Sequence, residues 1–350
     1  MKMIFDPTML SALSGADSFM VCTHVRPDGD AIGSLLSVGR LLRAMGKHVT
    51  LVCQDAVPEK YFNYFEDAKA VLAPVQAKDM HFDAALAVDV ASAERMGEAL
   101  ELFESAQVTM QIDHHHGNPL YAMHNAVDAT ASATGEMIVQ LYDALNVPVD
   151  AVAAAQLYVA ISTDSGNFTF NSVSAQTFAA MQRLMESGLD IAAVNNSLFK
   201  DRKVQQVKML SCALSTLTFF ADGQATHMCV TQEDLCKANA GSEHLNGIVN
   251  AGLDIEGVKI TFMCDEMPDG SWKVSLRAKP GYHVNDIAAH FGGGGHQLAA
   301  GCKISAPYEE VCAVLSSLIE DQLRKCWKGL STYSSPRACL QVLWSPWSSA

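Results

Sequence analysis

Residues 24–30 read His-Val-Arg-Pro-Asp-Gly-Asp and stand between an apolar run, 19–22, and a helical pattern, 31–45. Three of these seven residues are potential metal ligands, at positions i, i+4 and i+6. A polar loop between a buried strand and a helix is where open α/β sheets place their active sites, at the carboxyl ends of parallel strands. The stretch therefore predicts both a strand–helix unit and a candidate site.

The first half of the chain repeats this alternation of apolar runs and helical periodicity. Strands separated by helices form βαβ units, so we predict an α/β domain with a parallel sheet flanked by helices. The predicted strands are 19–23, 49–53, 82–88 and 108–112, and the predicted helices are 32–45, 93–103, 133–145 and 151–161.

The period changes in the second half. Residues 174–215 have a nearly continuous helical pattern, and the charged part around 200–206 suggests a connector. Further on, we predict strands at 217–220, 226–230, 258–264 and 272–277 and helices at 284–290 and 307–325. The expected domains are 1–190 and 215–326, joined by a helical linker, 191–214, and followed by a disordered tail, 327–350.

Composition limits the possible classes of protein. The 350 residues have a formal net charge of −14, most of it in residues 1–190, which hold 23 acidic and 10 basic residues. Such a surface disfavours long nucleic acids, whose binding depends on many phosphate contacts. No apolar run approaches the length of a membrane span. The ten cysteines show no regular spacing, so we expect reduced thiols and a cytoplasmic protein.

Potential ligands follow apolar segments at four places in the first half, and the ends of parallel strands meet at one edge of a sheet. Taken singly, each has a simpler explanation: an Asp after a strand is usually a turn or cap residue, and residues 24–30 could be a capped helix start. Together they supply enough carboxylates and imidazoles for two metal ions with a shared acid. Mixed Asp and His ligation favours Mn²⁺, Fe²⁺ or Co²⁺ over Mg²⁺. The four sites are His24/Asp28/Asp30, Asp89, Asp113-His114-His115 and Asp164.

This combination resembles the four motifs of the DHH phosphoesterase superfamily. Arg277 and residues 292–301, Gly-Gly-Gly-Gly-His-Gln-Leu-Ala-Ala-Gly, resemble the companion DHHA1 domain. The resemblance covers about residues 15–325 and is strongest to the bacterial bifunctional oligoribonuclease and pAp phosphatase group, the nanoRNase type. It implies a smaller α/β second domain with a mixed sheet.

The resemblance also implies a role for each residue. Two divalent ions, with Mn²⁺ the leading candidate, are expected at the sheet edge, bridged by Asp89. Asp113 would orient an imidazole, His115 would face the scissile phosphate, and the second domain would hold the terminal phosphate or nucleotide. One ion would have the ligands His24, Asp28 and Asp89, the other Asp30, Asp89, His114 and Asp164, and the phosphate-holding residues would be Arg277, Gly293, Gly294, Gly295 and His296.

The resulting hypothesis is a two-metal enzyme that hydrolyses very short RNA to 5′-mononucleotides and dephosphorylates 3′-phosphoadenosine 5′-phosphate (pAp). A cyclic- or linear-dinucleotide phosphodiesterase would use the same residues and remains open. A long-strand exonuclease would need further binding domains, and a family II pyrophosphatase lacks the glycine–histidine run. A non-catalytic nucleotide-binding scaffold is disfavoured because no expected ligand is missing. The sequence leaves open whether the chain forms a homodimer.

Overall fold

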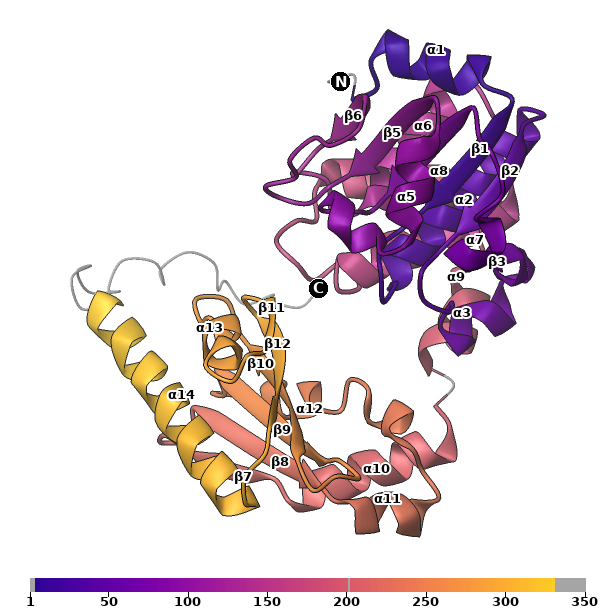
Figure 1. Cartoon of the computed structure of the whole chain (residues 1–350). Coiled ribbons are helices and arrows are strands. Elements are labelled where there is room, and N and C mark those ends of the chain that lie inside the picture. The colour runs from indigo at the N-terminus through magenta and orange to yellow at the C-terminus, as the bar shows by residue number, and fades with distance from the viewer. Residues whose placement is uncertain (1–3, 201, 331–350) are drawn as a thin grey trace, which may run out of the picture. The chain divides into compact units, whose positions relative to one another are not determined.

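The computed structural model describes residues 4–200 and 202–330. The chain divides into two compact units, residues 1–201 and 202–350 (Figure 1). This division falls inside the predicted linker, 191–214. Its first part, α9 (Ile191–Asn195) and the π-helical turn η3 (Asn196–Lys200), packs on the first unit through Val194 and Leu198. Its second part, α10 (Val204–Ser215), packs on the second unit.

The first unit contains a six-stranded sheet in the order β3-β2-β1-β4-β5-β6. All its strand pairs are parallel, and a parallel sheet is what the sequence predicted. The chain builds outward from β1 to β3 and then returns to place β4 on the other side of β1. Such sheets bind ligands where the strand order reverses, which here is at the carboxyl ends of β1 and β4. The strands are β1 (Ser18–Cys22), β2 (His48–Val52), β3 (Val71–Leu72), β4 (Ala84–Val88), β5 (Val108–Asp113) and β6 (His124–Val127).

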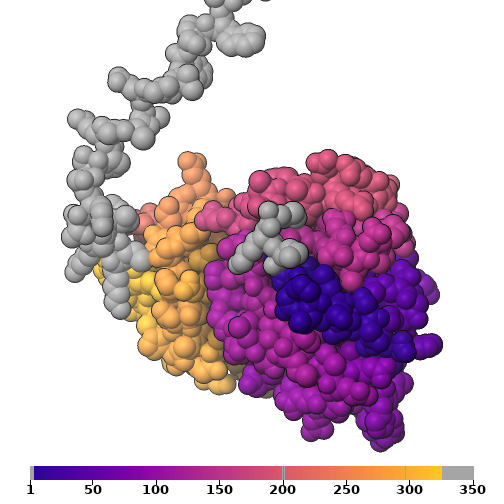
Figure 2. All heavy atoms as spheres, turned by 90° about the horizontal axis from the view of Figure 1, so that it is seen from above, coloured from indigo at the N-terminus to yellow at the C-terminus, as the bar shows by residue number. Residues whose placement is uncertain are grey.

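Helices cover both faces of this sheet, as the apolar character of its strands requires. Successive residues of β1 point to opposite faces: Phe19 and Val21 pack with α2, α6 and α7, whereas Met20 and Cys22 pack with η2 and α5. Figure 2 shows α1, in indigo, on the outer surface of the unit. The helices are α1 (Pro7–Gly15), α2 (Gly29–Ala44), α3 (Glu59–Tyr64), α4 (Pro74–Ala77), α5 (Ala99–Ser105), α6 (Thr134–Ala144), α7 (Ala151–Asp164) and α8 (Ala175–Glu186), with 3₁₀ turns η1 (Glu66–Ala70) and η2 (Ala93–Met96).

Two glycines let α2 and α7 pack almost backbone to backbone. A Cβ atom at Gly33 would overlap the carbonyl oxygen of Gln156, and one at Gly29 would overlap the side chain of Thr163. Thr163 directly precedes the last residue of α7, so this packing brings the end of α7 beside the start of α2. A helix end is thereby placed at the same edge as the strand ends.

The second unit contains a mixed six-stranded sheet in the order β11-β12-β10-β9-β8-β7, in which only β8 and β9 are parallel. The strands are β7 (Thr218–Phe220), β8 (Ala225–Val230), β9 (Ile260–Glu266), β10 (Trp272–Ala278), β11 (Gly294–His296) and β12 (Ala299–Ile304). The remaining helices are α11 (Gln232–Ala238), α12 (Asn250–Leu253), α13 (Val284–Ala289) and α14 (Tyr308–Leu330), with a 3₁₀ turn η4 (Ser242–Leu245).

The two faces of this second sheet are covered unequally. Helices α13 and α14 pack across β8, β9, β10 and β12 on one face. On the other face, α10 and α11 pack against β8 and β9. There β10 and β12 present Lys273, Ser275, Arg277 and Lys303, which are exposed or half-buried. This partly open face is a platform for polar side chains.

The structure differs from the predicted elements in several places. The predicted helix 93–103 is split into η2 and α5 at Gly97, whose φ of 60° ends the first turn. The helical pattern of 174–215 is interrupted between α8, α9 and α10. The sequence did not predict strands β3, β6, β11 and β12 or helices α1, α3, α4, α11 and α12. Helix α14 continues to Leu330, beyond the expected domain end at 326, and residues 331–350 of the predicted tail lie outside the described residues.

Within residues 4–200 and 202–330, no helix has both the length and the apolar character needed to cross a bilayer.

Candidate active site

The loop after β1 is held in shape by its own polar groups. Asp28 caps α2, because its Oδ1 atom accepts the N–H of Ala31 at 3.1 Å. Arg26 has a left-handed backbone, with φ of 55°, and its N–H donates to Oδ2 of Asp55 at 2.6 Å. These contacts leave the ring of His24, which is 5% exposed, directed at Asp28 and Asp89.

Asp30 is a fully buried carboxylate at the amino end of helix α6. It accepts the N–H of Thr134 at 2.7 Å and that of Gly135 at 3.0 Å, and the hydroxyl of Ser34 donates to it at 3.0 Å. Free N–H groups and the helix dipole at this end favour a negative charge. The start of α6 therefore compensates part of the cost of burying Asp30.

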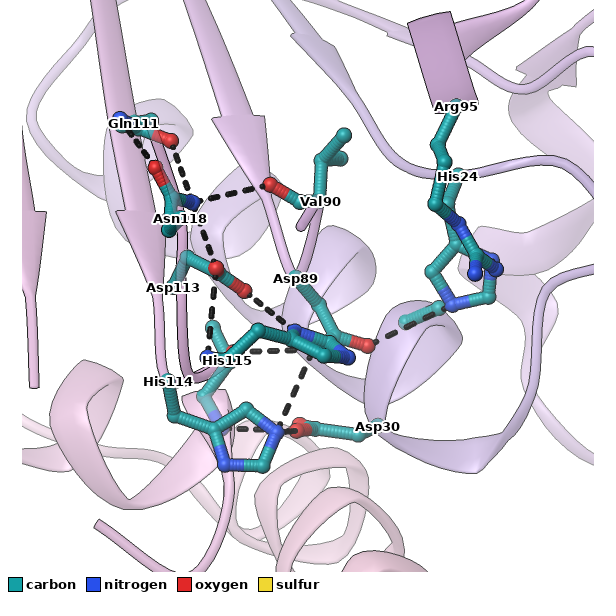
Figure 3. Close-up of polar contacts among 12 residues, drawn as sticks. His24, Asp30, Asp89, Val90, Arg95, Gln111, Asp113, His114, His115 and Asn118 are labelled. Atoms are coloured by element: carbon teal, nitrogen blue, oxygen red, sulfur yellow. Dashed lines mark hydrogen bonds and ion pairs between the residues drawn. The ribbon is translucent and has the colours of Figure 1, made fainter. Parts of the chain in front are cut away.

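Asp89 lies at the centre of the site (Figure 3). It follows β4 with a left-handed backbone, φ 59°, and its N–H donates to the carbonyl of Ile112 at 3.0 Å. One carboxylate oxygen lies 3.6 Å from Nε2 of His24, and the other lies 3.7 Å from Nε2 of His114. The hydroxyl of Thr134 donates to this second oxygen at 3.1 Å. Asp89 thus lies between the imidazoles of His24 and His114, and the oxygen that faces His114 is also 3.7 Å from Nδ1 of His115.

His114 joins the other two acids of the cluster. Its Nε2 atom lies 3.0 Å from Oδ2 of Asp164 and 3.7 Å from Oδ2 of Asp30. Its Nδ1 atom lies 3.3 Å from the carbonyl of Ala131, which can only accept, so Nδ1 carries a proton and Nε2 is the nitrogen that faces the acids. The end of α7, which carries Asp164, therefore lies at the same edge as the strand ends.

His115 is oriented by the buried carboxylate of Asp113 rather than by the cluster. Its Nδ1 atom donates to Oδ1 of Asp113 at 2.7 Å, and Asn118 donates to Oδ2 at 2.6 Å. Burial alone would raise the pKa of Asp113, but the hydrogen bonds from His115 and Asn118 outweigh it and hold this pKa below its usual range. Asp113 therefore stays ionised and fixes the ring.

The electrostatics of the cluster favour a bound cation. Burial, together with the charges of Asp89 and Asp164, raises the pKa of Asp30 well above its ordinary value. Burial would lower the pKa of His114, yet its hydrogen bond to Asp164 and the charges of Asp30 and Asp89 raise it to about 10. Carboxylates crowded in a buried site repel one another, and a divalent ion relieves that repulsion.

Three overlapping groups of side chains could hold a metal ion, and in each group the ligand atoms lie within 4.8 Å of one another. Their donors are imidazole nitrogens and carboxylate oxygens, a set that suits first-row divalent ions. The structure thus brings together the six side chains predicted as ligands. The groups are His24, Asp28 and Asp89; Asp30, His114 and Asp164; and Asp89, His114 and His115.

Three contributors to the site were missed by sequence reasoning. Thr134 binds two of the acids, Asn118 holds Asp113, and the guanidinium of Arg95 lies 3.3 Å from Nδ1 of His24. The predicted helix start near residue 133 was an available signal for Thr134, because helix starts attract carboxylates. Arg95 and Asn118 lie in turns, where the sequence gives no sign of what they contact.

In the second unit, Arg277 lies on the partly open face of β10. Its guanidinium donates to the carbonyl of Leu276 at 2.8 Å, and burial lowers its pKa. No carboxylate within residues 202–330 forms an ion pair with this guanidinium. A half-buried cation without a counter-ion is suited to an anionic ligand.

The glycine run pairs with β12, which lies beside β10. A Cβ atom at Gly293 or Gly295 would overlap the backbone of β12, whereas one at Gly294 would meet nothing within 4 Å. Close strand approach therefore explains Gly293 and Gly295, whereas Gly294 leaves open space, as does Gly292, whose φ is 69°. The backbone of His296 lies in β11, but its side chain is outside the described part of the structure.

Comparison with known proteins agrees with this geometry. The DHH family, N-terminal domain, matches residues 18–161, and the DHHA1 domain matches residues 225–325. The bifunctional oligoribonuclease and PAP phosphatase NrnA of Thermus thermophilus is 30% identical, over 87% of this chain and 88% of that protein. The protein of the same name from Bacillus subtilis is 26% identical, over 89% of this chain and 96% of that protein.

A solved structure supports the fold as a whole. An exopolyphosphatase-related protein from Bacteroides fragilis superposes with a TM-score of 0.85 at 23% sequence identity, covering 95% of this chain and all of that one. The matched domains and the similarity to the Thermus relative indicate the same family as the metal-ligand cluster at the sheet edge. The chain belongs to the DHH/DHHA1 family of phosphoesterases.

Proposed function

We propose that this phosphoesterase is a manganese-dependent enzyme that hydrolyses very short oligoribonucleotides to 5′-mononucleotides and dephosphorylates pAp. The position of Asp89 between the imidazoles of His24 and His114 carries the proposal, because one carboxylate there can serve two metal ions. The names of the Thermus and Bacillus relatives support the substrates. The acidic first unit supports short substrates over long ones.

The two ions would be shared among six side chains. His24, Asp28 and Asp89 would hold one, and Asp30, His114 and Asp164, together with Asp89, the other. When bound, such ions withdraw charge from the phosphate and make water a better nucleophile at neutral pH. Nitrogen and oxygen donors in one site support Mn²⁺ over Mg²⁺.

His115 would contact the scissile phosphate. Its bond to Asp113 sets the orientation of the ring, so the imidazole is placed before the substrate arrives. Arg277 would bind the terminal phosphate or nucleotide, helped by the backbone of the glycine run, Gly293, Gly294 and Gly295, and by His296. The eight cysteines between residues 22 and 312 are free thiols, which supports a reducing, cytoplasmic location.

A cyclic- or linear-dinucleotide phosphodiesterase is the second candidate. The cyclic-di-AMP phosphodiesterase PdeA of Listeria monocytogenes is 24% identical over 93% of this chain, but the match spans only 50% of that protein. The matches to the Thermus and Bacillus NrnA proteins span 88% and 96% of those proteins, which favours the oligoribonucleotide and pAp activities.

A substrate panel tests the proposal. The full chain is assayed with pAp, pApA, pGpG, cyclic-di-AMP, a 5-mer and a 20-mer RNA, each with Mn²⁺, with Mg²⁺ and with a chelator. We expect turnover of pAp, the linear dinucleotides and the 5-mer in Mn²⁺, weak turnover of the 20-mer and none with the chelator. Turnover of cyclic-di-AMP alone would contradict the proposal and support the second candidate.

A further inference from the structure

The segment after Asp164 makes an unusual left-handed turn. Gly166, Asn167 and Phe168 have φ values of 58°, 55° and 65°, although side chains other than glycine rarely adopt this region. The turn is fixed by the buried Ser165, whose hydroxyl accepts the N–H of Phe168 at 3.0 Å. The carbonyl of Ser165 accepts the N–H of Phe170, also at 3.0 Å. The backbone is therefore held in one shape directly beside a candidate metal ligand.

This turn presents two aromatic rings in different ways. Phe168 is partly buried and lies between Tyr158, with ring centroids 6.4 Å apart, and Phe178, at 5.9 Å. It anchors the turn to the core. Phe170 is 57% exposed, so most of its ring faces solvent. A ring exposed to this extent buries little apolar surface and so adds little to the stability of the fold.

The exposed ring belongs to the segment that follows a candidate metal ligand. A Cβ atom at Gly166 would overlap the ring of Phe170, so the ring is seated on the backbone of Gly166. Gly166 follows Asp164 by two residues, which is at most about 7 Å between Cα atoms. The ring of Phe170 is therefore within reach of a nucleotide whose phosphate is held at the cluster.

We propose that Phe170 is a stacking platform for the nucleobase next to the phosphate held at the cluster. Flat nucleobases stack on exposed aromatic rings irrespective of sequence, because every base has a π-face. The first unit is acidic and attracts the backbone of a nucleic acid poorly, so stacking supplies affinity that its charge does not. This inference rests on the proposed function and adds a base-binding subsite to it.

The test compares substrates with and without bases in the full-length protein with Mn²⁺. The variants are Phe170→Ala, Phe170→Leu and Phe170→Tyr, and the substrates are pApA and two versions that each lack one base. Phe219→Ala is the matched control, because Phe219 is 51% exposed on β7 in the second unit.

Phe170→Ala is expected to raise KM for pApA about tenfold, with little change in kcat. Phe170→Leu, which keeps an apolar side chain but no π-face, should also raise KM, whereas Phe170→Tyr and Phe219→Ala should stay within about twofold of the wild type. For one of the two abasic substrates, Phe170→Ala should no longer raise KM, and the base that this substrate lacks is the stacked base.

Two outcomes overturn the inference while leaving the proposed function intact. One is an unchanged KM for pApA in Phe170→Ala, and the other is an equal penalty with both abasic substrates, which would show a structural role. If the wild-type chain turned over no nucleotide in the panel, the proposed function would fail, and the inference would fail with it.

Discussion

The two units place polar side chains in opposite ways. In the first unit they lie at the ends of parallel strands, where buried groups such as Asp30 and Asp113 are crowded but well hydrogen-bonded. In the second unit Arg277 lies on the face of a mixed sheet, half-buried and without a carboxylate partner among the described residues. Parallel strands converge at an edge and concentrate charge, whereas an open sheet face spreads single charges over a platform.

This contrast suggests that the two units bind different parts of the reacting complex. The concentrated acids of the first unit are suited to cations, and the lone guanidinium of the second is suited to an anion. The charge distribution along the sequence agrees, since residues 1–190 carry nearly all of the formal net charge. Substitutions in each unit should therefore affect different steps, with metal binding and turnover tied to the first unit and substrate affinity to the second.

The strongest test of this division is Asp89→Ala in the first unit. Both imidazole groups would lose the carboxylate between them, so we expect turnover of pAp to fall by about a thousandfold or more. Metal bound per chain, measured by elemental analysis after dialysis, should fall as well.

His115→Ala is the matched comparison at the same edge. It should also lower kcat, but because Asp113 rather than the cluster holds His115, the variant should retain its metal. Near-normal Mn²⁺-dependent activity of Asp89→Ala would refute a shared carboxylate. Loss of metal in His115→Ala would assign that ring to the ligands instead, as the third possible group allows.

The sequence predicted which side chains of the first unit lie together, and the reason is physical. Apolar runs ending in His or Asp mark the carboxyl ends of buried strands, and a parallel sheet gathers those ends whatever their separation in the chain. The role of Thr134 was not predicted, because its contacts with Asp30 and Asp89 depend on where the start of α6 lies in space. Strands β11 and β12 were not predicted because they are rich in glycine and alanine, which have low strand propensity. These strands form through their antiparallel pairing with each other.

The second unit's part in the contrast is tested by Arg277→Ala. A charge-assisted pair to a phosphate is worth about 1.5–3 kcal/mol, so KM for pAp should rise by about tenfold to a hundredfold while metal content stays unchanged. Lys273→Ala is the control, because Lys273 lies on the same strand and face but is exposed. Loss of metal in Arg277→Ala would mean that the residue supports the fold of the site, and an equal effect of Lys273→Ala would reduce the role of Arg277 to general surface charge.

The contrast between the units also extends to a buried carboxylate outside both sites. Asp265 on β9 is 4% exposed, and its Oδ1 atom has no hydrogen-bond partner among the described residues, unlike the buried acids of the first unit. Burial raises its pKa to about 6, and the charge of Lys273 offsets only part of this. The folded protein therefore holds this proton more tightly than the unfolded chain, and the unfolding free energy falls as the pH rises from about 4 to 6.

Asp265→Asn should remove this pH dependence without affecting turnover. Above pH 6 the variant should be more stable than the wild type by up to about 3 kcal/mol, and the difference should shrink towards zero near pH 4. Hydrogen exchange of the β9 and β10 amides reports on this unit alone, with Glu256→Gln, an exposed neutral substitution, as the control. Equal protection of the amides from hydrogen exchange in the variant and the wild type at pH 7 would contradict this prediction. It would mean that the charge of Asp265 is solvated in the folded protein.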